Sequence, residues 1–183
     1  LNFSFRNSLY FNKNLQKYST TYTYGSSKNK QQYFIGSQEN TIQLHQVDFA
    51  HKFATFWVLD IMGKLSENNL DTENFNNRNY TIDAKEIQPK ISFLYNENNR
   101  LTAFYHYKNK LNRLQDFEEL NQQKFGLEYF YINSKKNQIS ANINVFLNNF
   151  TGNVNTPVAY QMLEGLQAGK NYTWSLLFNQ KIN

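Results

Sequence analysis

A strict alternation of apolar and polar residues between positions 139 and 148 limits what this chain can fold into. The apolar residues at every second position are Ile139, Ala141, Ile143, Val145 and Leu147, and Phe146 is the one apolar residue between them. A period of two residues is that of a β-strand with one dry face and one wet face. The pattern returns at Tyr172, Trp174, Leu176, Phe178 and Ile182. Such a division is typical of a wall between lipid and water.

The same alternation predicts strands along most of the chain. The dry faces are aliphatic, with Tyr and Trp near the strand ends, and the wet faces carry Asn, Ser, Thr and Lys. Pro89 marks an irregularity, because proline cannot donate to a strand ladder. The segment 31–36 is ambiguous. The other expected strands cover 1–11, 17–24, 41–49, 53–65, 80–95, 100–110 and 124–132, with His51 in a turn.

The connections favour a barrel. Short polar turns are expected at 12–16, 96–99 and 133–137, and long polar connections at 66–79, 110–123 and 149–170. Bacterial barrels show this alternation, with short periplasmic turns and longer outer loops. We therefore predict an all-β fold: an antiparallel transmembrane β-barrel, as a segment of a larger barrel, formed by 1–183 as a single region. A soluble β-sandwich is the alternative. A short amphipathic helix is also predicted at 111–120.

Composition agrees with this fold class. No apolar run approaches the roughly 20 residues of a membrane helix, whereas barrel strands are half apolar. The chain has no Cys, and its aromatic content of 17% is high for a mean hydropathy of −0.72. The net charge of +5 comes from scattered Lys and Arg, so nucleic acid is not an expected partner. The chain starts at Leu1 and stops at Asn183, and we expect a piece of a longer protein.

The pattern also assigns faces to individual side chains. On the predicted dry faces, one set is expected to contact lipid and a second, aromatic set to lie at the membrane interfaces, where Tyr and Trp are enriched. The lipid-facing set is Ile139, Ala141, Ile143, Val145, Leu147, Leu176 and Phe178. The interfacial aromatic set is Tyr105, Tyr107, Tyr129, Tyr131, Tyr172 and Trp174.

Three segments carry a family resemblance. The segment 156–176, which reads TPVAYQMLEGLQAGKNYTWSL, resembles a segment near the C-terminus of large outer-membrane or surface proteins of Bacteroidota. The hairpin 89–105 and the segment 77–82 are similar to that family too. The resemblance implies a C-terminal β-barrel region with further strands after Asn183. It implies no catalytic residues.

No pattern points to catalysis, to a cofactor or to a metal. The spacing of His45, His51 and His106 gives no metal-ligand signature, and His106 is expected on a wet face. The acidic residues of 116–119 lack a partner base and are expected to be solvated. No residue is therefore assigned to catalysis, cofactor binding or metal binding, and the chain is not expected to be an enzyme.

The connection 156–169 is too apolar for a freely solvated loop. Either it packs against the barrel wall or lumen, or it contacts a partner through Tyr160, Met162 and Leu163, because aromatic and flexible apolar groups dominate contact energies.

For function, we expect a non-enzymatic integral barrel subunit of a cell-envelope or surface assembly in the bacterial outer membrane, serving export, outer-membrane biogenesis or uptake. Its expected partners are outer-membrane lipid and other envelope proteins. The alternatives are an autonomous solute channel or receptor, and a soluble glycan-binding β-sandwich.

Overall fold

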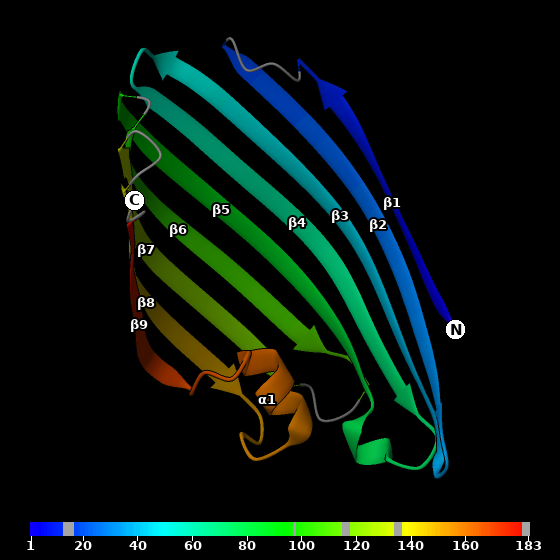
Figure 1. The fold of residues 1–183 in the computed structure, drawn as a ribbon. Helices are drawn as coiled ribbons and strands as arrows, with labels where there is room; N and C mark the ends of the chain where they lie inside the picture. Colours follow the sequence, from blue (N-terminus) through cyan, green and yellow to red (C-terminus); the bar gives the residue numbers. More distant parts are fainter. Residues whose placement is uncertain (13–16, 97, 115–117, 134–136, 181–183) are drawn as a thin grey trace.

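The fold is one antiparallel sheet in which strand order follows chain order (Figure 1). The computed structural model describes residues 1–12, 17–96, 98–114, 118–133 and 137–180. Each strand pairs with its neighbours in sequence, as expected for a meander. The nine strands are β1 (Asn2–Phe11), β2 (Tyr18–Tyr33), β3 (Gly36–Ala54), β4 (Trp57–Thr72), β5 (Tyr80–Asn96), β6 (Asn99–Asn112), β7 (Glu119–Asn133), β8 (Asn137–Thr151) and β9 (Gly169–Gln180).

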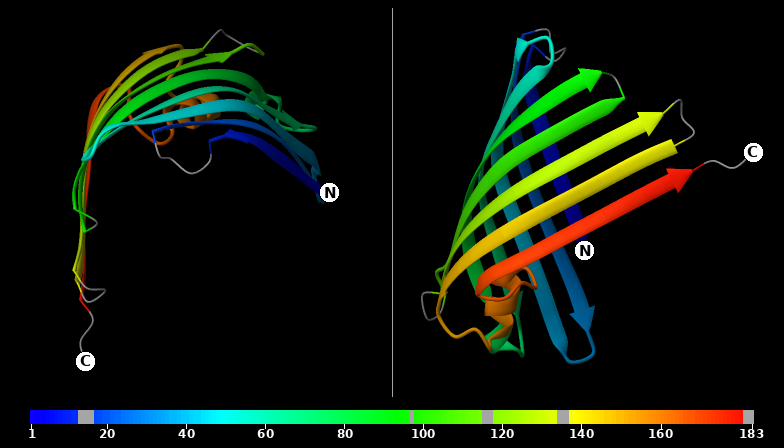
Figure 2. Two further views of the ribbon diagram at one scale, coloured as in Figure 1. Left: turned by 90° about the horizontal axis from the view of Figure 1, so that it is seen from above. Right: turned by 90° about the vertical axis from the view of Figure 1, so that its left-hand side faces the viewer.

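The sheet is a curved section of wall with an inside and an outside. Seen from above, it bends into an arch (Figure 2). The helix α1 (Pro157–Leu163), which connects β8 and β9, lies on the concave side, and the short helix η1 (Asn76–Arg78) connects β4 and β5. The sheet ends at β1 and β9, and neither strand has a partner strand on its outer side among the described residues. This is the form of an incomplete barrel.

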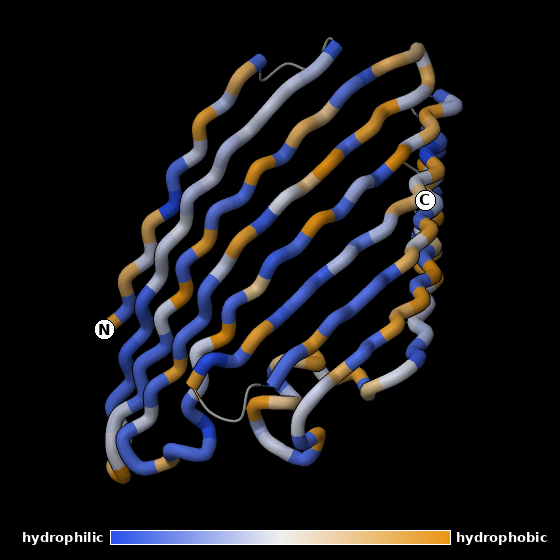
Figure 3. The backbone as a smooth tube through the Cα atoms, turned by 180° about the vertical axis from the view of Figure 1, so that it is seen from behind, coloured by the Kyte–Doolittle hydropathy of each residue, from blue (hydrophilic) through white to orange (hydrophobic). Residues whose placement is uncertain are grey.

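The convex face is apolar over much of each strand. Because the strands pair in register, Phe125 lies beside Val145, and Val145 beside Tyr172. Phe125 is 46% exposed and Tyr172 is 63% exposed. Other large apolar side chains on the same face, from β1 to β9, are exposed too. An exposed apolar surface that extends across nine strands is typical of a face that contacts a membrane or another protein. We call this region the apolar band; its alternating colours run along the upper part of the strands in Figure 3.

Toward the end that carries α1, the convex face becomes polar. On β4, Leu65 is followed on that face by Glu67, Asn69 and Asp71, and the face of β7 changes from Phe125 to Gln123 and Asn121. The strands therefore continue beyond the apolar band into a region that we call the polar extension. It is the predominantly hydrophilic lower part of the sheet in Figure 3.

The polar extension corrects the expected long connections. About half of each of the segments 66–79 and 110–123 is strand, because β4 runs to Thr72, β6 runs to Asn112 and β7 starts at Glu119. The segment 149–170 remains a long connection between the end of β8 at Thr151 and the start of β9 at Gly169. Apart from Leu111, the strand residues of these segments are polar on the convex face, so their composition is like that of a loop. The ambiguous segment 31–36 is the end of β2, a turn at 34–35 and the start of β3.

Three smaller expectations are also settled. The prediction of a helix at 111–120 is wrong for the described residues, because Leu111 lies in β6 and Leu120 lies in β7. Residues 115–117 of that segment are outside the described residues. His51 lies in β3, and the turn comes at 55–56. The segment around Pro89 is one strand, as predicted, and the pairing of β5 with β6 skips Gln88 and Pro89.

The turns predicted at 12–16, 96–99 and 133–137, as well as Ile182, lie wholly or partly outside the described residues. No helix in the described part of the chain is long and apolar enough to span a membrane.

Candidate functional site in the concave wall

The connection between β8 and β9 folds inward as a capped helix. Thr156 is the N-cap residue, and its hydroxyl accepts a hydrogen bond from the Ala159 amide at 2.9 Å. Pro157 follows at the first helical position, where its missing N–H is not needed. Glu164 closes the helix in the left-handed conformation, with φ 56°. The order Thr-Pro at the start and Glu-Gly at the end therefore determines where α1 begins and ends.

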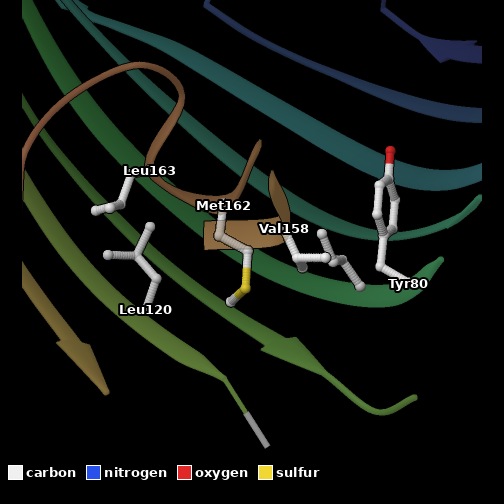
Figure 4. Packing of buried hydrophobic residues seen from close by; sticks show 6 residues of the cluster. Tyr80, Leu120, Val158, Met162 and Leu163 are labelled. Carbon is white, nitrogen blue, oxygen red and sulfur yellow. The ribbon is translucent and has the colours of Figure 1, made fainter. Parts of the chain in front are cut away.

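One side of α1 packs on the concave face of the polar extension. The helix contributes Val158, Met162 and Leu163, and the wall contributes Tyr80, Ile82 and Leu120 (Figure 4). Met162 and Leu120 have no exposed surface. The hydroxyl of Thr156 also donates to the buried Glu118 carboxylate at 2.8 Å, which ties the start of the helix to the end of the β6–β7 connection. The helix is thus held by an apolar core and a polar contact.

A network of charges joins the helix to the wall. The Nζ atoms of Lys108 and Lys110 donate to one Glu164 carboxylate oxygen at 2.7 and 2.8 Å. Lys110 also donates to the Met162 carbonyl oxygen at 2.8 Å. Both lysines are largely buried, and a buried ammonium needs such partners because leaving water is costly. The last turn of α1 is therefore bound to two adjacent wall lysines.

The network continues across three strands toward the apolar band. Glu86 on β5 accepts from Lys64 of β4 at 3.0 Å and contacts Nε2 of His106 on β6 at 2.9 Å. Its carboxylate also lies 3.7 Å from the Lys108 ammonium. We call the connected set the charged belt; its members are Lys64, Glu86, His106, Lys108, Lys110 and Glu164.

The charge state of Glu164 depends on this network. Burial alone would raise the pKa of the Glu164 carboxyl, because burial disfavours the charged form. Hydrogen bonds from Lys108 and Lys110, together with their charges, outweigh burial and hold the pKa below the ordinary 4.5. Glu164 is thus a carboxylate at neutral pH, and its contact with the wall is a charge-assisted one.

The concave wall is polar over much of its surface. The concave wall carries charged and amide side chains at successive positions of adjacent strands, including the hydrogen-bonded pairs Asn142–Ser175 and Asn144–Thr173 on β8 and β9. A helix inside the arch narrows the space that such a wall bounds. No group of three or more His, Cys, Asp and Glu side chains that could hold a metal occurs among the described residues.

All residues predicted to face lipid lie on the convex face. In β8 these are the five odd-numbered residues from Ile139 to Leu147, and in β9 Leu176 and Phe178 pair with Ala141 and Ile139. Ile143 is 59% exposed and Leu176 66% exposed. Contact of these side chains with lipid itself remains a prediction.

The six predicted interfacial aromatic residues share the convex face, at different depths. Tyr107 and Tyr172 lie where the apolar band meets the polar extension, because the next residues on that face toward α1 are Asn109 and Lys170. Tyr131 stands near the opposite margin, two residues before the end of β7. Tyr105, Tyr129 and Trp174 are one step farther into the band. Their interfacial role remains a prediction.

The predicted partner contacts need a correction. Met162 and Leu163 are 0% and 4% exposed because they form the core beneath α1, so they are not free to contact another protein. The connection instead packs against its own wall, which was the other expectation for it. Tyr160 differs: it points away from that core and is 70% exposed.

The charged belt was missed by sequence reasoning. Its members are far apart in sequence, with Glu164 56 positions after Lys108, and strand register brings them together. One usable signal was His106, Lys108 and Lys110 at alternating positions, which puts three basic groups on one strand face. A second was Thr156-Pro157, a helix start that would have revealed α1.

Comparison with known proteins is informative at the level of the fold. No protein-family model matches the chain, and no curated protein matches it. The solved structure of outer-membrane expressed OmpT of Vibrio cholerae matches over 97% of this chain and 56% of that one, with TM-score 0.61 and 14% identity. In-vitro folded OmpT of that organism gives TM-score 0.62 at 13% identity, over 97% and 55%. Its trimer form gives 0.60 at 14% identity, over 96% and 56%.

These likenesses confirm the predicted fold class. The chain spans about 55% of the length of these structures, and the shared part is an all-β antiparallel wall. The chain has the fold of an outer-membrane β-barrel. All the matched structures come from an outer-membrane protein, which supports the bacterial outer membrane as the location expected from the sequence.

Proposed function

We propose that this chain forms part of the wall of a β-barrel in the bacterial outer membrane, and that the barrel admits small polar solutes through a water-filled lumen. The observation that carries the proposal is the contrast between the two faces: an apolar convex band, and a concave wall that bears the charged belt and α1. A face of charged and amide groups is compatible with water, whereas the convex face is compatible with lipid. The proposal includes no catalytic step.

In this proposal, the connection between β8 and β9 sets the width of the passage. Its helix is attached to the wall by Glu164 and by the core around Met162, so it narrows the lumen permanently. The experiment is conductance of the purified full-length protein in a planar bilayer, compared with a variant in which residues 153–166 are replaced by a short Gly-Ser linker. We expect discrete channels, and a larger conductance in the variant. A full-length protein that inserts but does not conduct would contradict the proposal.

A role as a subunit of a larger envelope assembly is the second candidate. The observation that favours it is Tyr160, a large aromatic side chain left 70% exposed at the surface of a packed helix. The resemblance to the C-terminal barrel region of large Bacteroidota surface proteins agrees with this candidate. Purification of the native protein in mild detergent, followed by mass spectrometry, tests it. Stoichiometric partners that are lost with Tyr160→Ala are expected; recovery of the barrel alone contradicts it.

A further inference from the structure

The charges of the concave wall do not balance. The charged belt contains the ammonium groups of Lys64, Lys108 and Lys110, but its carboxylates are those of Glu86 and Glu164. Each carboxylate is shared between lysines, so the acidic groups are already used. The buried Glu118 carboxylate at the start of α1 matches the third lysine, so a surplus of positive charge beside α1 depends on a further cation.

Lys124 on β7 adds a fourth ammonium group next to the belt. It is directly beside His106 of β6 on one side and Phe146 of β8 on the other. No ion pair involves it among the described residues. Glu128, the next acidic residue on this face of the strand, is four residues away, or about 13 Å at 3.3 Å per residue. The Lys124 ammonium therefore has no carboxylate at ion-pair distance, and Glu128 and Glu164 act on it only from farther away.

Two aromatic rings hold Lys124 in place. Its Nζ lies 5.0 Å from the centroid of Phe104 and 5.2 Å from that of Phe146. The Phe104 ring occupies the space beside Gly126, where a Cβ atom would come within 2.2 Å of the ring. A ring face attracts an ammonium group but carries no net charge, so the cation keeps its full charge. The lysine is therefore positioned without being neutralised.

We infer that this wall selects for small anions, such as carboxylates or inorganic phosphate, and that Lys124 is a residue that determines this selectivity. The inference rests on the proposed water-filled lumen. In a narrow aqueous space with low-dielectric walls, an excess of one sign raises the local concentration of the opposite ion. Rings of lysine or arginine are the usual basis of anion preference in pores.

The test is the reversal potential of the full-length protein in a planar bilayer under a KCl gradient. The variants are Lys124→Gln, Lys124→Glu and the charge-conserving Lys124→Arg. Lys85→Gln is the matched control, because it removes the same charge from an exposed position on the convex face. We expect the wild type to prefer chloride, and the chloride-to-potassium permeability ratio to fall about twofold for each unit of charge removed within about 8 Å of the ion path.

The outcomes separate this inference from the proposed function. A fall in the ratio with Lys124→Gln, a larger fall with Lys124→Glu, and wild-type values with Lys124→Arg and Lys85→Gln would support it. A conducting wild type that prefers potassium, or equal effects of Lys124→Gln and Lys85→Gln, would overturn the inference while leaving the channel intact. Absence of conductance in all variants would overturn the proposed function and this inference together.

Discussion

The apolar band and the polar extension are built from the same strands, yet different forces hold them. In the band, the convex face is apolar and exposed, and the concave face is polar. In the extension, the convex face is polar, and the apolar core lies on the concave side, beneath α1. The position of the apolar residues thus reverses along a single strand. This difference teaches that a barrel strand can be amphipathic in two opposite senses, with its apolar residues on the outer face in one part and against its own inward loop in another.

The strongest test of the comparison is the core of the extension. Met162→Ala removes a fully buried side chain from the contact between α1 and the wall. Removal of a buried Met costs about 2–5 kcal/mol, because the lost contacts leave a cavity. We expect the connection 152–168 to become sensitive to limited proteolysis in the inserted protein, with the sheet intact. Tyr160→Ala, on the exposed side of the same helix, is the control, and its stability should stay within about 0.5 kcal/mol of the wild type. Equal sensitivity of both variants to proteolysis would contradict the packing of Met162 in a core.

The next test concerns the apolar band. Ile143→Arg puts a charge on the convex face, which costs about 2–4 kcal/mol at the membrane midplane. The folded, inserted fraction in liposomes, measured by urea titration, is expected to fall. Two controls isolate the position: Gln123→Arg on the same face of the polar extension, and Asn142→Arg on the concave face beside Ile143. Normal insertion of Ile143→Arg would show that this face does not meet lipid.

A third test addresses packing within the concave face. Gly126→Ala places a Cβ against the Phe104 ring, where there is no room for it. Overpacking of this kind costs about 1–3 kcal/mol. Gly63→Ala is the matched control, since a Cβ there has no neighbour within 4 Å. The double variant Gly126→Ala with Phe104→Ala should recover part of the loss in urea titration, and a double variant no more stable than the single one would argue against the ring contact.

The smallest expected effect is that of pH on α1. The Glu164 pKa is lowered in the folded protein, so its contribution is full above the ordinary 4.5 and is lost as the pH falls through the folded pKa. Because the described chain has no Cys, a fluorophore at Tyr160→Cys reports on the helix. Its anisotropy should drop at acid pH. In Glu164→Gln the drop should be absent and the neutral-pH anisotropy lower; an unchanged acid transition in that variant would assign it to another group.

The same comparison explains what the sequence could and could not predict. The sequence predicts the central part of β8, 139–148, because an alternation of apolar and polar residues is visible in residue types alone, and it misses both ends of the strand. The sequence predicts loops where β4 and β6 end and where β7 begins, because the residues there are mostly polar, as are the connections that they join. The face on which a side chain such as Ile143 lies follows from its odd or even position in the strand. Partners such as Glu86 and Lys108 did not, because they depend on which strand lies beside which, and in what register.

The meander has a consequence for the order of assembly. Every strand pairs with a neighbour in sequence, so each pairing step closes a short loop at small entropic cost. The core beneath α1 is different: it joins Tyr80 to Leu163, and Lys108 to Glu164, across several strands. Those contacts require that β5 to β8 are already side by side. The inward helix is therefore expected to dock late, on strands that have already paired without it.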